Sequence, residues 1–227
     1  REIREAILKI CARFGDDYWL KKDKEGGFPH DFHQALAADG WLGIAMPEDY
    51  GGSGLGVTEA ALMMQAIAES GAGMSGASAV HIPVFSVQPV VLFGTQEQKA
   101  RILPTITSGE ALVCMGYSEP DNGSDLAGIT TRAVRDGDEW IINGAKMWTT
   151  MAHEAKWLIL LTRTDPDLAP RRGLTMFILP MDTPGITVRP IETLHGVAEF
   201  CEVFFDGVLV PSERLLGEVG GGWSVAM

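Results

Sequence analysis

MGYSEPDNGSD, residues 115–125, is the stretch from which the rest of the chain can be interpreted. β-prone residues lead up to Ser118, after which Pro120 and Gly123 force the backbone to turn. Ser124 comes next, so the corner offers side-chain oxygens together with backbone N–H groups. A corner of this kind can hold the edge of a heterocycle on one side and a phosphate on the other. On composition alone, an ordinary loop with Asx and serine turns is the more frequent alternative.

A second informative stretch, NGAKMWTT at residues 143–150, follows after a short β-prone segment. Its Asn-Gly dipeptide indicates a tight turn, from which a strand would present Trp148. Thr149 and Thr150 add hydroxyl groups beside the indole. An indole next to hydroxyl donors can stack on a planar cofactor and hydrogen-bond to it, although a strand tryptophan taken alone is more often a core residue.

The chain before these stretches has the residue spacing of helices. Ile3, Ile7, Ile10 and Phe14 recur at helical spacing and predict an amphipathic first helix. Further helices are expected over residues 31–38, 59–70 and 95–104, and residues 77–93 are expected to form a buried helical pair. The TQEQ pattern that begins the helix at 95–104 is typical of a capping box, and Pro104 predicts its end.

After about residue 110 the pattern changes to short β-prone runs separated by turn residues. Asp136-Gly137, Asn143-Gly144 and Asp206-Gly207 are all typical of hairpin turns. Strands are expected over 111–118, 129–135, 139–142, 156–162, 174–179, 186–189 and 199–205. Such a series predicts a small antiparallel barrel or sandwich. The expected fold class is therefore α+β, with a helical domain at 1–110, a β-domain at 111–212 and the opening of a third segment at 213–227.

The composition of the 227 residues is that of an ordinary globular protein, since 46% are hydrophobic and 21% are charged. With 18 Lys and Arg against 30 Asp and Glu, the net charge is −12, which argues against nucleic-acid binding. Cys11, Cys114 and Cys201 lie far apart in the sequence, which favours free thiols in a reducing compartment over disulfides. The charged N-terminus predicts no signal peptide, and the prolines and polar residues within 77–93 argue against a membrane span.

Two familiar patterns lack the context that their chemistry needs. GAGMSG at residues 71–76 matches the G-x-G-x-x-G pattern, but a helix is expected before it, where a dinucleotide fingerprint needs a strand. A turn between two helices is the alternative that we favour. His30 and His33 could lie close together on a helix, but no third ligand follows at a suitable spacing, so no metal site is predicted.

Together, the stretches at 115–125 and 143–150 resemble the flavin-binding signature of the acyl-CoA dehydrogenases. In that family Ser/Thr-Glu-Pro leads into a Gly-Ser-Asp turn, and Gly-x-Lys-x-Trp, a hydrophobic residue and Thr follow after a short hairpin. The resemblance extends over nearly the whole chain, through PEDYGGSG (47–54), FGTQEQKARILP (93–104), GLTMFILPMDTPGITV (173–188) and FFDGVLVPSERLLGEVGGGW (204–223). It implies an N-terminal helical domain, a middle β-domain and a C-terminal helical bundle, of which only the opening residues would lie before Met227.

The chemistry that the resemblance implies is α,β-dehydrogenation of an acyl-CoA thioester with FAD as the cofactor. A carboxylate takes a proton from Cα while hydride passes from Cβ to flavin N5. The family's base is a glutamate of the C-terminal domain, so no catalytic base is expected before Met227. Glu119 is expected to be structural and to cap the turn in which it lies.

Residues that match the family's motif are expected to contact the cofactor. Ser118 would hydrogen-bond near flavin N5, Trp148 would cover the isoalloxazine ring, and Ser124 would face the FAD phosphates or the CoA arm. The residues expected to bind FAD are Met115, Tyr117, Ser118, Gly123, Ser124, Trp148, Thr149 and Thr150, with Ser124 also assigned to the substrate. Two departures from the family pattern stand out. Thr149 occupies a position where isoleucine is common, and Asp121-Asn122 replaces small residues near the expected phosphate.

The resemblance also implies partners. The substrate would be an acyl-CoA, the electron acceptor an electron-transfer flavoprotein, and the full-length protein a homodimer or homotetramer. An acyl-CoA oxidase, a nitroalkane oxidase and a non-catalytic flavin- or CoA-binding homologue stay open as alternatives. Gly76, Ser78 and His81 are candidates for lining the acyl end of the pocket. A bacterial cytoplasm is the expected location, with the mitochondrial matrix as the alternative.

Overall fold

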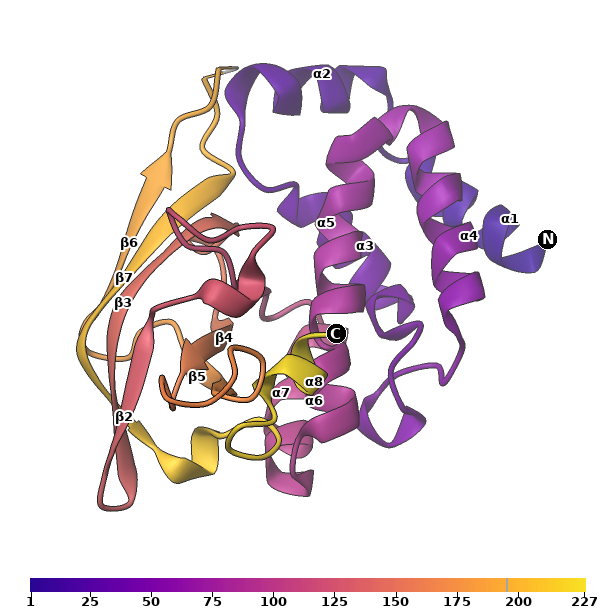
Figure 1. Ribbon diagram of the computed structural model, residues 1–227. Helices are drawn as coiled ribbons and strands as arrows, with labels where there is room; N and C mark the ends of the chain where they lie inside the picture. Colours follow the sequence, from indigo (N-terminus) through magenta and orange to yellow (C-terminus); the bar gives the residue numbers. More distant parts are fainter. Residues whose placement is uncertain (195) are drawn as a thin grey trace. The chain divides into compact units, whose positions relative to one another are not determined.

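The computed structural model describes residues 1–194 and 196–227. The described chain divides into two compact units. A helical unit comprises Arg1–Val91 and Gln96–Leu112, and a β-unit comprises Leu92–Thr95 and Val113–Met227. In Figure 1 the helical unit is coloured indigo to magenta and the β-unit mainly pink to yellow. The α+β class predicted from the sequence is confirmed.

Five helices of the helical unit, α1 to α5, share one apolar core. Its elements are α1 (Glu2–Cys11), α2 (Asp16–Glu25), α3 (His30–Ala38), η1 (Trp41–Gly43), η2 (Glu48–Tyr50), α4 (Val57–Ile67), η3 (Ala68–Ala72), α5 (Gly73–Ser86), the start of α6 (Gln88–Phe93) and α7 (Gln96–Thr107). Ile7 and Ile10 of α1 are buried in one cluster with Phe32 and Leu36 of α3 and Met63 of α4. The helical spacing of the isoleucines thus places the apolar face of α1 in the core.

The run from α4 to α6 is the most apolar helical part of the described chain. Val57–Phe93 is long and apolar enough to cross a membrane by length and composition alone, with a mean hydropathy of 1.5. It does not run straight, however, because Gly71 (φ 99°) and Gly73 (φ 55°) bend it, and α4 and α5 lie side by side (Figure 1). A buried helical hairpin has the same composition, so the run is no independent evidence for a membrane.

The G-x-G-x-x-G pattern falls at this bend. Gly76 is buried, and a Cβ placed on it would lie 2.5 Å from the Cβ of Ala72 and 3.2 Å from the ring of Trp19. Gly76 therefore allows close helix packing, as expected for a turn between helices. Ser78 is half-buried, and His81 is exposed and stacks on Phe85 with ring centroids 4.3 Å apart.

The helix expected to end near Pro104 continues through this proline and ends three residues later, at Thr107. A proline removes one backbone donor, but its carbonyl can still accept hydrogen bonds. The carbonyl of Pro104 accepts from Ser108 N–H and from Thr107 Oγ1, both at 3.1 Å. These bonds hold the last turn of the helix together.

The β-unit contains a mixed seven-stranded sheet. Its strands are β1 (Val113–Gly116), β2 (Arg132–Asp136), β3 (Glu139–Thr150), β4 (Trp157–Arg163), β5 (Leu174–Pro180), β6 (Ile186–Ile191) and β7 (Phe200–Pro211). The strand order is β1-β4-β2-β3-β7-β6, and β5 pairs with β4. Figure 1 shows the strands β2, β3, β7 and β6 as a curved layer. Three short helices complete the unit: η4 (Leu126–Gly128), η5 (Ser212–Arg214) and α8 (Gly222–Ala226).

The sequence predicts a wholly antiparallel sheet, and the structure corrects this. β1 runs parallel to β4, and β2 also pairs with β4 in parallel, through Arg132 and Arg163. Strand β4 therefore has β1 and β5 as neighbours, and its residues from Trp157 to Thr162 are all buried. A strand that is buried on both faces reads as a continuous apolar run and not as an alternating one.

Only one of the three expected hairpin turns forms. Asp136-Gly137 joins β2 to β3, which is confirmed by the pairing of Asp136 with Glu139. Asn143-Gly144 lies inside β3 and Asp206-Gly207 lies inside β7, so those two turn predictions are wrong. The pairing shifts register between Ile142 and Gly144, and Asn143 Oδ1 accepts the Gly207 N–H at 2.8 Å. The long β3–β7 pairing thus absorbs both dipeptides as irregularities that bend the strands.

The three cysteines are free and buried, in agreement with the sequence-based expectation. Cys11 belongs to the helical core, and Cys114 and Cys201 belong to the core of the β-unit.

His33 is the clearest titratable group of the helical core. Its side chain is 1% exposed, and its Nε2 has no hydrogen-bond partner among the described residues. Burial, helped by the nearby His30, lowers the pKa of His33 from 6.5 to about 4. The folded unit therefore holds His33 neutral at pH values where the unfolded chain protonates it.

We expect acid to destabilise the helical unit through His33. The stabilising effect of a neutral His33 is complete above pH 6.5 and is lost as the pH falls towards 4, by at most about 3 kcal/mol. Replacing His33→Leu should flatten the pH dependence of the unfolding free energy over this window, measured by urea unfolding and circular dichroism. His81→Gln is the control in the same unit. Burial also lowers the pKa of His81, but less than that of His33, so this variant should flatten the pH dependence less. A variant that loses stability in acid as steeply as the wild type would contradict the prediction.

Candidate functional site

The two informative stretches of sequence meet directly in the β-unit. Met147 N–H of β3 donates to the carbonyl of Ser118 at 2.9 Å. Lys146 Nζ donates to the carbonyl of Tyr117 at 3.0 Å and to Glu119 Oε1 at 2.9 Å. The structure therefore places the segment that follows β1 against the last part of β3, although 27 residues separate Glu119 from Lys146.

Glu119 is buried and has a full set of hydrogen-bond partners. One carboxylate oxygen accepts the N–H and the hydroxyl of Thr130, at 2.7 and 2.8 Å. The other accepts Thr131 N–H at 2.8 Å and Lys146 Nζ. Its backbone N–H and C=O bond to the C=O and N–H of Asn122, which closes the turn around Pro120. These contacts confirm the expectation that Glu119 is structural.

The charge of Glu119 is maintained at neutral pH. Burial by itself would raise the pKa of Glu119, but the charge of Lys146 and hydrogen bonds from Thr131, Lys146 and Thr130 outweigh burial and lower the pKa to about 2. The stabilisation from this carboxylate is thus complete above its unfolded pKa near 4.5 and is lost as the pH falls towards 2.

Lys146 is a residue of the candidate site whose buried contacts the sequence did not predict. It was part of the quoted motif, but only the structure shows that its side chain is 0% exposed and paired with Glu119. Its stem also packs closely, since a Cβ on Gly116 would lie 3.3 Å from Lys146 Cγ. A lysine in a strand position that alternation assigns to the core was the available signal.

Trp148 sits on an irregular stretch of β3. The pairing with β7 shifts register between Lys146 and Thr149, and Trp148 has φ 59°. Its side chain is 56% exposed and contacts the ring edge of Phe200, with centroids 6.1 Å apart. A non-glycine residue with positive φ is strained, and such strain clusters at functional sites. The strain is thus associated with an indole that is presented outward.

The segment after Trp148 is fastened to β7. Met151 also has a positive φ, of 55°, and its N–H donates to the carbonyl of Glu199 at 2.8 Å. Two residues later, His153 Nδ1 lies 3.1 Å from Cys201 Sγ. These contacts hold both strained residues in place.

The two threonines after Trp148 differ in burial. Thr149, which stands where isoleucine is common in the family, is 1% exposed, and its Oγ1 has no hydrogen-bond partner among the described residues. Thr150 is half-buried. The inward side chain of Thr149 occupies an apolar position, so Thr150 is the better placed of the two hydroxyls to donate to a ligand.

The loop after Glu119 has an anchored end and an exposed tip. Gly123 and Ser124 are exposed, and a Cβ on Gly123 would meet no atom within 4 Å. Beyond the tip, the Arg163 guanidinium donates to the carbonyls of Ala127, Ile129 (3.3 Å) and Pro170 (2.7 Å). Neither packing nor a positive φ requires glycine at 123, so the backbone at this position is open to solvent on the side where a Cβ would lie.

These residues fit FAD in the kind of contact that they offer. Trp148 provides an outward aromatic surface, Ser118 and Thr150 provide half-buried hydroxyls, and Gly123 leaves room for a close approach. Met115 and Tyr117 are half-buried beside them at the end of β1, and burial raises the pKa of Tyr117 to about 12, so its phenol is neutral. Binding of FAD by any of these residues stays a prediction.

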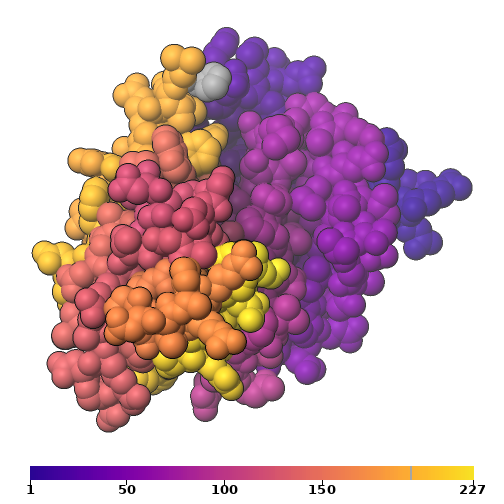
Figure 2. Space-filling view, in the orientation of Figure 1, coloured from indigo at the N-terminus to yellow at the C-terminus, as the bar shows by residue number. Residues whose placement is uncertain are grey.

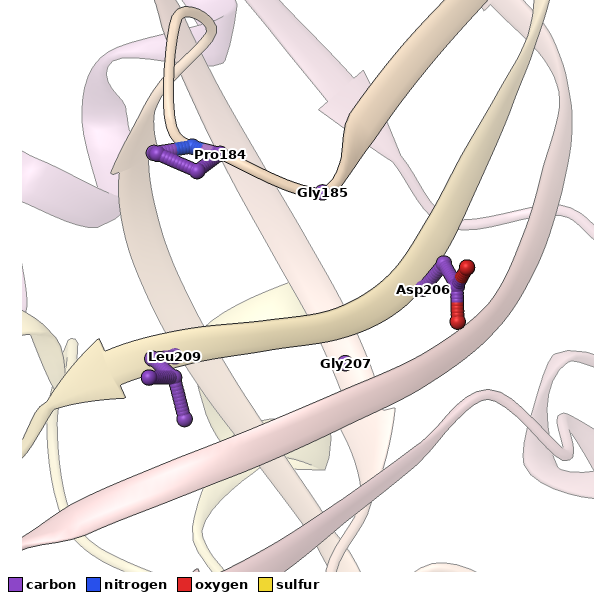
Figure 3. Close-up of a pocket in the computed structure, with 5 residues that line it drawn as sticks. All are labelled: Pro184, Gly185, Asp206, Gly207 and Leu209. Carbon is purple, nitrogen blue, oxygen red and sulfur yellow. The ribbon is translucent and has the colours of Figure 1, made fainter.

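One hollow of the β-unit lies apart from these residues. It has a volume of about 330 Å³ and is lined by Pro184, Gly185, Asp206, Gly207 and Leu209 (Figure 3). The hollow forms where β7 bends at Asp206-Gly207, and none of the residues predicted to bind FAD lines it. Another exposed feature is the β4–β5 loop at 166–172, which carries Arg171 and Arg172 and lies in the orange region of Figure 2.

The buried hydroxyl of Thr149 predicts an effect on stability. Thr149→Val removes an unpaired polar group and keeps the shape of the side chain, so we expect the melting temperature to stay equal or to rise by a few degrees. Thr131→Val is the matched control, since Thr131 Oγ1 donates to the Ala145 carbonyl at 3.2 Å and its loss should destabilise. Differential scanning calorimetry of both variants tests this, and a clear loss of stability in Thr149→Val would contradict it.

Comparison with known proteins matches almost the whole chain. Residues 1–110 match the model of the acyl-CoA dehydrogenase N-terminal domain, and residues 114–208 match that of the acyl-CoA dehydrogenase middle domain. The acyl-CoA dehydrogenase IpdE1 of Mycobacterium tuberculosis is 40% identical over 197 residues, which are 86% of this chain and 50% of that protein. The chain thus spans about half the length of the curated relatives it matches.

Solved structures agree. A probable acyl-CoA dehydrogenase from Mycobacterium abscessus superposes with a TM-score of 0.92 at 27% identity, covering 100% of this chain and 60% of that one. The ChsE4–ChsE5 complex from Mycobacterium tuberculosis gives a TM-score of 0.87 at 31% identity, covering 99% and 57%. With the helical unit, the mixed sheet and the joined Ser-Glu-Pro and Lys-x-Trp segments, these matches show that the chain belongs to the acyl-CoA dehydrogenase family.

Proposed function

We propose that this chain provides the flavin-binding part of an FAD-dependent enzyme that dehydrogenates an acyl-CoA between Cα and Cβ. The observation that carries the proposal is the junction of two segments in the β-unit, where Ser118 is bonded to β3 beside an outward, strained Trp148. Both segments match the family's flavin signature, and the family itself is an oxidoreductase family.

The residues of this chain would act by binding and orienting. When bound, FAD supplies the acceptor for hydride from the substrate Cβ. Trp148 would cover the ring and exclude water from one side of it, while Ser118 and Thr150 would donate hydrogen bonds to its polar edge. Ser124, on the exposed tip, would face the pyrophosphate or the CoA arm. Asp121 is also exposed on this tip, so cations or backbone N–H groups would have to balance its charge near a phosphate.

The proton transfer belongs to residues outside this set. Glu119 is ionised, but its oxygens are already occupied by Thr130, Thr131 and Lys146, so it has no free position for a substrate proton. By family resemblance the base is a glutamate that follows the β-domain in the longer relatives.

Partners follow from the same resemblance. We propose an acyl-CoA substrate, an electron-transfer flavoprotein as the acceptor, and a homodimer or homotetramer for the whole protein. Assembly from two different chains is the alternative suggested by the ChsE4–ChsE5 complex. A bacterial cytoplasm is the proposed location, with the mitochondrial matrix as the alternative. An acyl-CoA oxidase or nitroalkane oxidase would differ by releasing hydrogen peroxide during turnover, and a non-catalytic homologue would bind flavin or CoA without turnover.

The proposal predicts that the protein binds FAD and that Trp148→Ala weakens this binding about tenfold or more, because stacking area is lost. Titration of the purified protein with FAD, followed by the quenching of flavin fluorescence, measures the dissociation constant. Leu209→Ala, which removes an exposed apolar side chain elsewhere on the same sheet, should leave it unchanged.

Catalysis is tested with the full-length protein and with its Trp148→Ala variant, each loaded with FAD. Anaerobic addition of mixed acyl-CoA should bleach the visible absorption of the bound flavin. Equal flavin affinity in Trp148→Ala and wild type would overturn the assignment of the site, whereas bound flavin that never bleaches would favour a non-catalytic homologue.

A further inference from the structure

Lys146 has a role that goes beyond pairing with a carboxylate. We propose that Lys146 is a positioning residue that holds the end of β1 in register with the irregular stretch of β3 at Trp148. The proposal rests on the proposed binding of flavin, and it adds a residue that the flavin itself need not touch.

The ammonium group of Lys146 binds on both sides of Ser118. It donates to the carbonyl of Tyr117, the residue before Ser118, and to the carboxylate of Glu119, the residue after it. The carbonyl of Ser118 itself accepts from Met147, the residue after Lys146. Three consecutive residues of one segment are therefore bonded to two consecutive residues of the other, which leaves Ser118 little freedom to move.

The position of Lys146 along β3 gives it a second effect. Lys146 pairs with Val203 of β7, and this is the last regular pair before the register shifts at Met147 and Trp148. The side chain of Lys146 therefore anchors the strand immediately before Trp148 turns outward. Ser118 and Trp148 are held relative to each other through the same residue.

The aliphatic part of the Lys146 side chain packs tightly, so the link depends on the length of this side chain. The side chain is fully buried and packs beside Gly116, where a Cβ would lie 3.3 Å from Lys146 Cγ and 3.1 Å from Leu160 Cδ1. An uncharged, unbranched side chain of similar length, such as that of methionine, can fill most of this space but cannot bond to Tyr117 and Glu119. This allows packing and positioning to be separated by experiment.

A purely structural role is the competing explanation. A buried ion pair can often be replaced by neutral groups of similar size without loss of stability, whereas removal of one partner leaves a buried charge. Lys146→Met alone would leave Glu119 uncompensated. In the double variant Lys146→Met with Glu119→Gln, neither partner is charged. The amide oxygen can accept only one of the two backbone N–H groups of Thr130 and Thr131 that the carboxylate accepts. Comparison of the double variant with Glu119→Gln alone therefore isolates what the ammonium group of Lys146 contributes.

The experiment compares wild type, both single variants and the double variant. Arg189→Met is the matched control, because it breaks the exposed pair of Arg189 with Glu202 on the same sheet. Three properties are measured: the melting temperature, the dissociation constant for FAD, and hydrogen–deuterium exchange of the amides in residues 117–131. Amide exchange does not depend on flavin, so it reports on the segment even without the cofactor.

For the double variant we expect a folded protein, exchange in 117–131 at least tenfold faster than in wild type, and FAD binding at least tenfold weaker. A folded double variant with unchanged exchange and unchanged FAD affinity would overturn the proposal. If the wild type binds no FAD, the proposed function of the chain fails, and exchange alone then decides whether Lys146 positions the segment.

A further test uses the wild-type protein alone, so it does not depend on whether the variants fold. If Lys146 holds the segment, the amides of Thr131 and Met147 should be protected to the level of the β4 core. Exchange of these amides as fast as that of the exposed loop at 166–172 would overturn the proposal.

Discussion

The buried ion pair between Lys146 and Glu119 is the interaction on which the candidate site depends. Both side chains are nearly inaccessible to solvent, and their charged atoms lie 2.9 Å apart. Losing one member of such a pair typically costs about 3–5 kcal/mol, because the remaining charge stays buried. Here the carboxylate also accepts three hydrogen bonds from Thr130 and Thr131. One ionic contact therefore joins the end of β1, the return of the loop and the last part of β3.

This fastening explains how a strained stretch of backbone persists. Trp148 and Met151 each have a positive φ, which costs of order 1–3 kcal/mol for a residue with a side chain. Regular β3–β7 pairing before the stretch, and the bonds of Met151 and His153 to β7 after it, supply the compensation. The strained residue Trp148 presents an indole that is more than half exposed. An outward aromatic ring next to half-buried hydroxyls is an arrangement on which a planar group can stack and to which it can hydrogen-bond.

Within the loop at 119–131, hydrogen bonds fix the two ends and leave the tip exposed. Glu119 and Arg163 anchor the two ends through buried or carbonyl-directed hydrogen bonds, and the tip at Gly123 and Ser124 stays exposed. A loop with anchored ends and an exposed tip can present backbone N–H groups to a ligand without a large rearrangement. By family resemblance, the residue that removes the proton lies in sequence beyond the two matched domains, so the role that we propose for the site described here is to orient the cofactor and not to remove the proton.

Local chemistry made much of this protein predictable from its sequence. The helix at 2–11 follows from the spacing of its isoleucines, and the helix at 30–38 lies between Pro29 and Gly40, where one was expected over 31–38. The Asp136-Gly137 hairpin follows from the positive φ that glycine tolerates. The two flavin-like stretches could be found because their residues are adjacent in the chain. Long-range pairing decided the rest. It absorbed Asn143-Gly144 and Asp206-Gly207 into strands, made β1 and β4 parallel, and turned Trp148 outward. The role of Lys146 belongs to this second group, because an ammonium group and its acceptors 27 and 29 residues away become partners only when the sheet has closed.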